Sequence, residues 1–468
     1  MLCLALFGLY FYPALLLLAI FWVKAFRNDR YDFLIMISLF FGGYGMLNVN
    51  IFPVWTSDLA LLLALVYWVI LRKPRILKLT LLAIVLYFAF LGIFAYLSIE
   101  KITTQLLIMR NYFGIVYIIV PIALFAGKDF DIHVFFTKCM PYLLIMCAFY
   151  ICDAIIIPGN ILVPQTYMPY EATSTFYDPF ILPLGTIYRK YPPGLFLLSL
   201  AVLPVARYYR LRLWQWALIG AALLASQTFT VIIGLATGVI LFQGSWRKIA
   251  RFFVLGVFGL VALYGIDCLL PDNDQKFNST LRIKSSVDQF FDLAKAVDDE
   301  DLANFASGRV AQILPKVDLM ISQNRTAIGL GFLHREKTTI NRYIIYNEYY
   351  TDLANADEVA TGVEVVPVQV FINIGYIGLI GHILFFVVLY LFIRKLKYSV
   401  YYLSVVYVVS VFGLSGFAGL ATFTGLQLTS IAYGVIILAN RDKLGWPKAA
   451  RNSRSPIFPT PQTNAAAL

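Results

Sequence analysis

The residues best suited to chemistry gather in and after the only long polar segment of a hydrophobic chain. The stretch is 307–332, in which Arg309 opens a short amphipathic segment and Gly329 and Gly331 form a closing turn. Glu364 follows at the entrance of the next apolar run. A carboxylate held near an apolar boundary can have its pKa raised and then act as a general base. The simpler interpretations are a solvated loop arginine, an ordinary turn and an acid favoured by the positive end of a helix.

Further cations stand where apolar runs meet loops. Arg189 and Lys190 directly precede the run that begins at residue 193, and Arg110 lies inside another run. Arginine supplies a planar, permanently charged fork, so Arg189 together with Lys190 can bind a lipid-linked phosphate. The alternative is that both side chains snorkel to the membrane interface. An arginine buried in a membrane is costly, which predicts a cavity or a partner for Arg110, with Asp153 as the suggested partner and snorkelling to the nearby outer surface as the alternative.

The segment after Arg309 has the periodicity of an amphipathic helix. Arg309, Gln312 and Lys316 fall on one side, which predicts that the helix lies on the membrane surface with its other side inward. We expect Pro315 to kink this helix or to begin a shorter one, because proline removes a hydrogen bond and clashes with the preceding turn. The apolar positions are Val310, Ile313, Leu314, Val317, Met320 and Ile321.

The elements that must position these residues are membrane helices. Of the 468 residues, 60% are hydrophobic and 13% are charged, too few charges for a soluble domain. Because a backbone inside a bilayer must satisfy its own hydrogen bonds, the apolar runs predict helices rather than barrel strands. The predicted fold is all-α, a polytopic integral membrane protein with about 12–13 transmembrane helices. The apolar segments are 1–23, 32–50, 56–71, 78–98, 104–126, 139–157, 193–207, 213–227, 229–243, 250–270, 366–393, 399–417 and 419–439.

Basic residues mark one side of this predicted bundle. They follow every second apolar segment, and the positive-inside rule places these loops in the cytoplasm. The two long loops, 158–192 and 271–366, are then extracytoplasmic, and the second carries 15 acidic and 10 basic residues. The basic loops are 24–30, 72–78, 128–138, 207–212, 247–251, 394–397 and 441–443.

Four regions follow from this topology. Residues 1–270 form transmembrane helices 1–10 with the outer loop 158–192, residues 271–366 form a long periplasmic loop, residues 367–440 form the C-terminal helices, and residues 441–468 form a disordered cytoplasmic tail. In the region of the eighth and ninth apolar segments, polar residues near Ser226 divide 213–242 into two shallow helices. Gly234 and Gly238 predict close helix packing there.

The same composition argues against several other classes of protein. The net charge of +11 comes from residues in short loops, so it reports orientation rather than nucleic-acid binding. Five cysteines and three histidines lack metal-ligand spacing, so we predict neither a metal site nor a cofactor.

The order of these features resembles the bacterial O-antigen polymerase and O-antigen ligase superfamily. Its members are many-span membrane enzymes with a long periplasmic loop late in the chain. In this family the loop carries an arginine and a glycine turn, a polar motif leads into a helix with spaced glycines, and a further arginine precedes an earlier span. The matching residues are Ser307-Gly-Arg309, Ala327-Ile-Gly-Leu-Gly331, Glu364 to Gly378, and Arg189.

The resemblance implies a glycosyltransferase that polymerises undecaprenyl-diphosphate-linked repeat units of O-antigen, capsule or exopolysaccharide. It would act on the periplasmic side of the bacterial inner membrane, without a metal and with inversion. Arg309, Arg189, Lys190 and Arg110 would stabilise the diphosphate, and Glu364 would orient or deprotonate the acceptor hydroxyl. The implied partners are the lipid-linked donor, the glycan acceptor, the bilayer and a chain-length regulator.

Other functions stay open at this point. A ligase would transfer the finished glycan to lipid A-core or to a protein, but the ligases carry a histidine where Glu364 stands. A polysaccharide flippase or other transporter would place charges and broken helices near the membrane midplane, whereas the charges here are few and close to the outer edge. A metal-dependent transferase would need an acidic pair, and the early loops supply only Asp58 and Glu100, singly.

Overall fold

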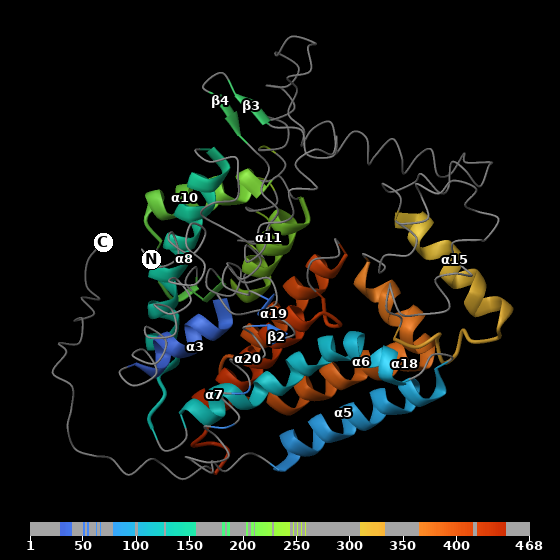
Figure 1. The fold of residues 1–468 in the computed structure, drawn as a ribbon. Coiled ribbons are helices and arrows are strands. Elements are labelled where there is room, and N and C mark those ends of the chain that lie inside the picture. Colours follow the sequence, from blue (N-terminus) through green and yellow to red (C-terminus); the bar gives the residue numbers. More distant parts are fainter. Residues whose placement is uncertain are drawn as a thin grey trace.

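The computed structural model is predominantly helical, in agreement with the predicted class, over the part of the chain that it describes (Figure 1). The described residues are 29–39, 50–51, 54–55, 62, 66, 78–98, 102–125, 128–155, 180–182, 185–187, 203–204, 207–209, 211–226, 229–243, 247, 250, 254, 258, 309–332, 365–414 and 419–445. The helices are α3 (Arg30–Leu39), α5 (Lys78–Leu97), α6 (Ile102–Met109), the 3-10 helix η2 (Arg110–Ile118), α7 (Ile119–Leu124), α8 (Ile132–Ile155), α10 (Leu213–Ser226), α11 (Phe229–Gln243), α15 (Arg309–Ser322), α18 (Val366–Ile393), α19 (Ser399–Gly413) and α20 (Phe423–Ala439).

Two small antiparallel strand pairs were not predicted. β1 (Asn50–Ile51) pairs with β2 (Val54–Trp55), and β3 (Phe180–Leu182) pairs with β4 (Gly185–Ile187). Each pair lies in a connection between predicted helices and has only two residues between its strands, a length typical of a tight hairpin. They leave the helical class unchanged.

Several predicted segments agree closely with observed helices. The start of α8 differs from the prediction, and this difference has a local cause. α18 has the predicted bounds, and α10 and α11 are separate helices, as expected from the polar residues near Ser226. α8 begins at Ile132 rather than at residue 139. The Asp131 side chain accepts a hydrogen bond of 2.8 Å from the His133 backbone N–H, so a cap extends the helix into polar sequence.

The helix α20 lies at the centre of the bundle. All its residues from Thr424 to Leu438 are buried, as expected for a helix that is apolar on every side. It contacts η2, α7 and α19 (Figure 1). A Cβ atom at Gly434 would lie 2.7 Å from the Ile118 carbonyl oxygen, so glycine permits α20 and η2 to approach closely.

The predicted close packing at Gly234 and Gly238 is confirmed, and the partner is α19. A Cβ atom at Gly234 would lie 3.2 Å from the Phe412 ring, and one at Gly238 would overlap the Val408 side chain. Small residues let these helix backbones approach in the way that membrane helices commonly pack.

Gly238→Leu is expected to destabilise the protein by about 1–3 kcal/mol, because the added side chain overpacks the contact with Val408. Gly220→Leu is the matched control, since nothing lies within 4 Å of a Cβ atom at Gly220. The measurement is the temperature at which detergent-solubilised protein loses its monodisperse elution peak. Equal temperatures for the two variants would contradict the packing assignment.

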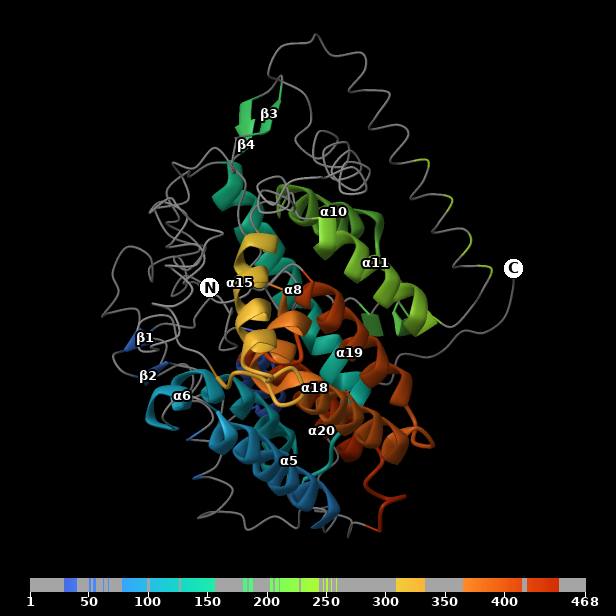
Figure 2. The ribbon, with the colours of Figure 1, turned by 90° about the vertical axis from the view of Figure 1, so that its right-hand side faces the viewer.

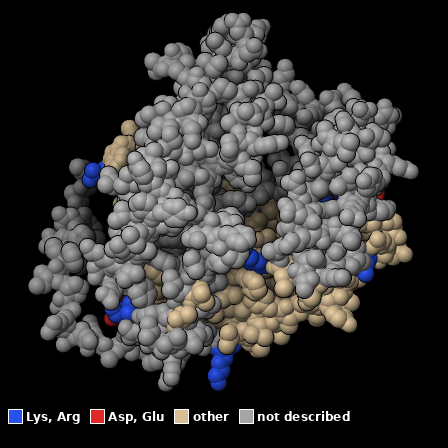
Figure 3. Space-filling view, in the orientation of Figure 1, with Lys and Arg blue, Asp and Glu red and all other residues tan. Residues whose placement is uncertain are grey.

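Within the part of the chain that the structure describes, α5 and α18 are long and apolar enough to cross a membrane. They lie side by side (Figures 1 and 2), and Leu86 and Val388 are 58% and 57% exposed. Figure 3 shows a broad uncharged surface over this part of the molecule. An exposed apolar surface of this extent is unusual for a soluble monomer and is typical of contact with lipid. The other exposed large hydrophobic residues of the two helices are Leu79, Leu81, Leu82, Val85, Ile93, Tyr96, Leu97, Tyr376, Ile377, Ile380, Ile383, Leu384, Val387, Leu391 and Phe392.

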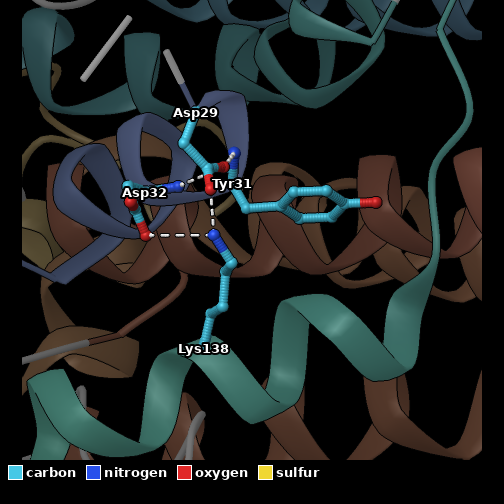
Figure 4. A network of polar contacts seen from close by, with 4 residues as sticks. All are labelled: Asp29, Tyr31, Asp32 and Lys138. Atoms are coloured by element: carbon cyan, nitrogen blue, oxygen red, sulfur yellow. Dashed lines mark hydrogen bonds and ion pairs between the residues drawn. The ribbon is translucent and has the colours of Figure 1, made fainter. Parts of the chain in front are cut away.

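Basic loops that are far apart in the sequence meet at one end of the bundle. The Lys138 amine lies between the carboxylates of Asp29 and Asp32, and it pairs with both (Figure 4). The Arg441 guanidinium pairs with Asp129. The residues before α3, the start of α8 and the turn after α20 therefore share one end.

The same end also holds the loop between α18 and α19. The Tyr398 hydroxyl lies 2.9 Å from His133 Nε2, and the Tyr209 hydroxyl donates to the His133 carbonyl oxygen over 2.9 Å. Residues 441–445, the first of the predicted tail, form a turn here, and the rest of the tail lies outside the described residues. The predicted topology places every second loop on the same side of the membrane, so it requires these basic loops to lie at one end of the bundle.

Candidate functional site at the break in α18

The helix α18 is broken at Gly375, near its first third. Gly375 has φ 66° and ψ −174°, a conformation open essentially only to glycine. A break of this kind leaves carbonyl groups before it and N–H groups after it without partners in the helix. These groups need partners from elsewhere in the chain.

The turn after α15 supplies those partners. The N–H groups of Leu330 and Gly331 donate to the Ile372 and Asn373 carbonyl oxygens, over 2.8 and 2.9 Å. In return, the N–H groups after the break donate to the turn: Tyr376 to the Thr326 oxygen over 3.1 Å, and Ile377 to the Ala327 oxygen over 3.2 Å. We call residues 326–331 and 372–377, joined by these four bonds, the interlock.

The predicted Gly-x-Gly turn is confirmed and has a specific role in the interlock. Gly329 and Gly331 have φ values of 77° and 105°, which L-residues rarely adopt. A Cβ atom at Gly329 would lie 2.5 Å from the Asn373 carbonyl group, and one at Gly331 would overlap the Ser98 side chain. The glycines are therefore needed both for the turn and for its close approach to α18 and α5.

The end of α5, the residue that follows it and a side chain of α6 hold the other side of the turn. Ser98 Oγ donates to the Leu330 carbonyl oxygen over 2.9 Å, and Arg325 Nη1 donates to the Leu97 oxygen over 2.7 Å. The Phe332 N–H donates to Gln105 Oε1 over 3.2 Å. Sequence reasoning missed Ser98, Gln105 and Arg325, although a glutamine inside an apolar run is a usable signal.

Arg110 lies on an element that touches the turn. It is half-buried and begins η2. Two residues later, the Tyr112 ring packs edge-on against Phe332, with ring centroids 5.4 Å apart. The structure thus brings the Arg110 segment to the end of the turn, while the side chain of its suggested partner Asp153 lies outside what is described.

The helix predicted after Arg309 is present, and Ile313 and Met320 of its predicted apolar side pack inward, but Lys316 and Ile321 differ from the prediction. Lys316 is 4% exposed and Ile321 is 58% exposed, the reverse of the expected pattern. The cause is tertiary packing: Leu319 and Met320 form a cluster with Leu330 of the turn and Ile372 of α18. The interlock fixes the end of α15 and so decides which face of this helix turns inward.

Of the two predicted effects of Pro315, the start of a shorter helix is not observed. α15 is one continuous helix from Arg309 to Ser322 and passes through position 315. Proline inside a helix costs about 3 kcal/mol or more. The packing of Leu319 and Met320 against α18 offsets this loss, because most helix stability in proteins comes from the packed face.

Burial changes the charge equilibrium of Lys316. Desolvation lowers the pKa of its ammonium group to about 8, because the charged form loses contact with water. Lys316 therefore remains mostly protonated at neutral pH, as a cation on the inner face of α15.

Other predicted residues are only partly placed. Glu364, Arg189 and Lys190 lie outside the described residues, and only the backbone of Arg309 is described. Even so, α15 begins at Arg309 and α18 begins two residues after Glu364. The interlock therefore fixes, relative to one another, the helix that Arg309 begins and the helix that begins two residues after Glu364.

A comparison of the chain with protein-family models finds no match, and neither does a comparison with curated protein sequences. We therefore infer function from the residues and their geometry.

Proposed function

We propose that the chain is a polytopic inner-membrane glycosyltransferase that polymerises undecaprenyl-diphosphate-linked oligosaccharide repeat units on the periplasmic side. The observation that carries this proposal is the interlock. Its four backbone hydrogen bonds join the segment that Arg309 opens to the helix that follows Glu364. This connection would hold the cation for the leaving group and the base for the acceptor close to one another.

The direction of α18 supports the periplasmic side. This helix runs from the interlock to Arg394, in the end of the bundle where the basic loops meet. Under the positive-inside rule that end is cytoplasmic, so the interlock would lie at the outer surface. A lipid-linked donor presents its diphosphate at this level.

The chemistry is a single displacement at the anomeric carbon of the donor sugar. The acceptor hydroxyl oxygen forms the new glycosidic bond as its proton passes to the Glu364 carboxylate. The bond between the anomeric carbon and the diphosphate oxygen breaks, and the diphosphate leaves with the electron pair. Arg309, Arg189, Lys190 and Arg110 stabilise the developing negative charge, which is the task where preorganised donors contribute most. Displacement from the opposite face inverts the configuration.

One observation favours a transporter as the second candidate. Transporters use broken helices near the membrane midplane to bind their substrates or ions, and α18 is broken. The break lies toward the outer end of α18, however, and four of the backbone groups around it bond to the turn. These backbone groups are therefore better suited to supporting a site at the membrane surface than to binding an ion in a cavity.

Deletion of the gene is expected to leave one repeat unit on the acceptor, because the donor is still made and exported but never extended. Electrophoresis of the surface glycans measures this, and a plasmid copy of the gene should restore the ladder. Accumulated lipid-linked polymer would indicate a ligase instead. Accumulation of repeat units on the inner leaflet would indicate a flippase, and either result would contradict the proposal.

A further inference from the structure

Gln105 is a fully buried polar residue inside a predicted membrane span. It is 0% exposed, and its amide group bonds to two other parts of the chain. The Nε2 atom donates to the Ala95 carbonyl oxygen of α5 over 2.9 Å, and the Oε1 atom accepts from the Phe332 N–H over 3.2 Å. Polar side chains are expensive inside a membrane span and usually serve a function there. A role beyond filling space is therefore expected for Gln105.

Gln105 differs from the other side chains that hold the turn, because it belongs to the helical run that carries Arg110. Ser98 and Arg325 attach the turn to the end of α5. Gln105 lies on α6, whose last residue, Met109, has helical φ and ψ values of −57° and −29°, so α6 continues directly into η2. Arg110 is the first residue of η2. The Gln105 hydrogen bond therefore joins the turn to the run that holds Arg110.

A second contact, on the other side of Arg110, fixes the same residue of the turn. The Tyr112 ring packs edge-on against the Phe332 ring, with an interplanar angle of 76°. Gln105 bonds to the Phe332 backbone, so the turn contacts the helical run both before and after Arg110. Arg110 can move relative to the turn only if one of these two contacts is lost.

The helix η2 is itself packed closely against the centre of the bundle. It is a 3-10 helix of nine residues, and residues three apart in such a helix share a face. Tyr112, Ile115 and Ile118 form one such face, and all three are buried. A Cβ atom at Gly114 would lie 2.4 Å from a backbone carbonyl oxygen of α20. The backbone from which the Arg110 side chain extends therefore has little freedom.

We infer that Gln105 is a positioning residue, which holds Arg110 beside the turn so that its guanidinium group can bind the diphosphate of the lipid-linked donor. The inference rests on the proposed function, in which Arg110 is one of the diphosphate ligands. Gln105 would not itself contact the donor. By fixing the backbone at Arg110, it reduces the conformational freedom that this arginine loses on binding, and preorganised groups bind more tightly for that reason.

The test is a double-mutant cycle on the binding of farnesyl diphosphate, a short prenyl diphosphate, to the full chain in nanodiscs. Arg110→Ala is expected to weaken binding about tenfold, since it removes a charge-assisted hydrogen bond. Gln105→Met is similar in size but lacks the amide, and it should weaken binding about two- to tenfold, the cost of ordering one long side chain. In the Arg110→Ala background Gln105→Met should have no further effect, because the side chain that it positions is gone.

Ser98→Ala is the matched control, because Ser98 also donates one hydrogen bond to the turn but stands at the end of α5. Whatever its size, its effect on affinity should be the same in the parental protein and in the Arg110→Ala background. Hydrogen exchange at the Phe332 N–H verifies that Gln105→Met releases the turn from α6. A purely structural role for Gln105 would lower the affinity equally in both backgrounds, as the control does.

Phe332→Leu is a second variant that tests the same inference through the other contact. It removes the ring contact with Tyr112 and leaves the backbone N–H for Gln105 in place. Its effect on affinity should likewise disappear in the Arg110→Ala background. The inference therefore stays testable if Gln105→Met fails to fold, and the elution profile of detergent-solubilised protein shows which variants are folded.

The outcomes distinguish this inference from the proposed function. Parental affinity in Gln105→Met, or an equal loss with and without Arg110, would overturn the positioning role and leave the polymerase intact. Parental affinity in Arg110→Ala would overturn it as well, because Arg110 would then not bind the diphosphate, while Arg309 and Glu364 keep their roles. If the parental protein failed to bind farnesyl diphosphate at all, the proposed function itself would be in error.

Discussion

Arg309→Ala and Glu364→Gln are each expected to abolish detectable chain extension while the protein still inserts into the membrane. Removing a preorganised group that stabilises developing charge costs about 10²–10³ in rate. Removing a general base costs about 10²–10⁴, and glutamine preserves the shape of glutamate without accepting the proton. The measurement is the glycan ladder of a deletion strain that carries each variant, with immunoblotting of the membrane fraction to verify insertion.

The long loop itself offers matched controls for these two substitutions. Arg335→Ala and Glu358→Gln change the same residue types in the same loop, at positions without a proposed role. They should leave the ladder unchanged. Extension at the parental rate by both Arg309→Ala and Glu364→Gln would remove the catalytic assignment, and loss of extension in the controls would show that the loop tolerates no change of charge.

The sequence was a good guide wherever local composition decides the structure. An uninterrupted apolar run bounded by a polar motif and by Arg394 predicts the bounds of α18. Because a backbone inside a bilayer must satisfy its own hydrogen bonds, such a run is expected to form a helix along its whole length. The beginning of α15 at Arg309 and the glycine turn after it follow from periodicity and from the conformations that glycine allows.

The break in α18 lies beyond such local reasoning. Gly375, Gly378 and Gly381 all stand in the same run, and only the first has a non-helical conformation. The choice depends on the backbone groups of residues 326–331, which are distant in the sequence. Because these hydrogen-bond partners are backbone groups far away in the sequence, they leave no periodic pattern in the residues of α18.

The orientation of α15 shows a different limit. Periodicity predicts an apolar face but treats Ile313 and Ile321 alike, whereas the first packs on the cluster with α18 and the second is exposed. The contact of Leu319 and Met320 with Ile372 overrides the simple amphipathic pattern and turns Lys316 inward. A buried lysine is thus a tertiary feature that helical spacing alone assigns to the wrong side.

Gly375→Ala is expected to lower the rate of chain extension about 100-fold, because it would separate the helix that Arg309 begins from the helix that follows Glu364. Alanine at this φ and ψ costs about 1–3 kcal/mol. Its Cβ atom would also overlap the Ala327 carbonyl group, so the turn has to move away. The readouts are the glycan ladder and hydrogen exchange at Leu330 and Gly331, whose N–H groups should lose protection together with activity.

Substitutions at two further glycines distinguish backbone strain from steric overlap as the cause of this effect. Gly445 also has a positive φ of 68° but nothing within 4 Å of a Cβ atom, and Gly92 lies in α5 with open space around it. Gly445→Ala therefore introduces backbone strain alone, and Gly92→Ala introduces neither strain nor a clash. If only Gly375→Ala loses both exchange protection and extension, the interlock positions the catalytic residues. Normal extension by a Gly375→Ala protein with unprotected Leu330 and Gly331 would mean that Arg309 and Glu364 do not depend on the interlock.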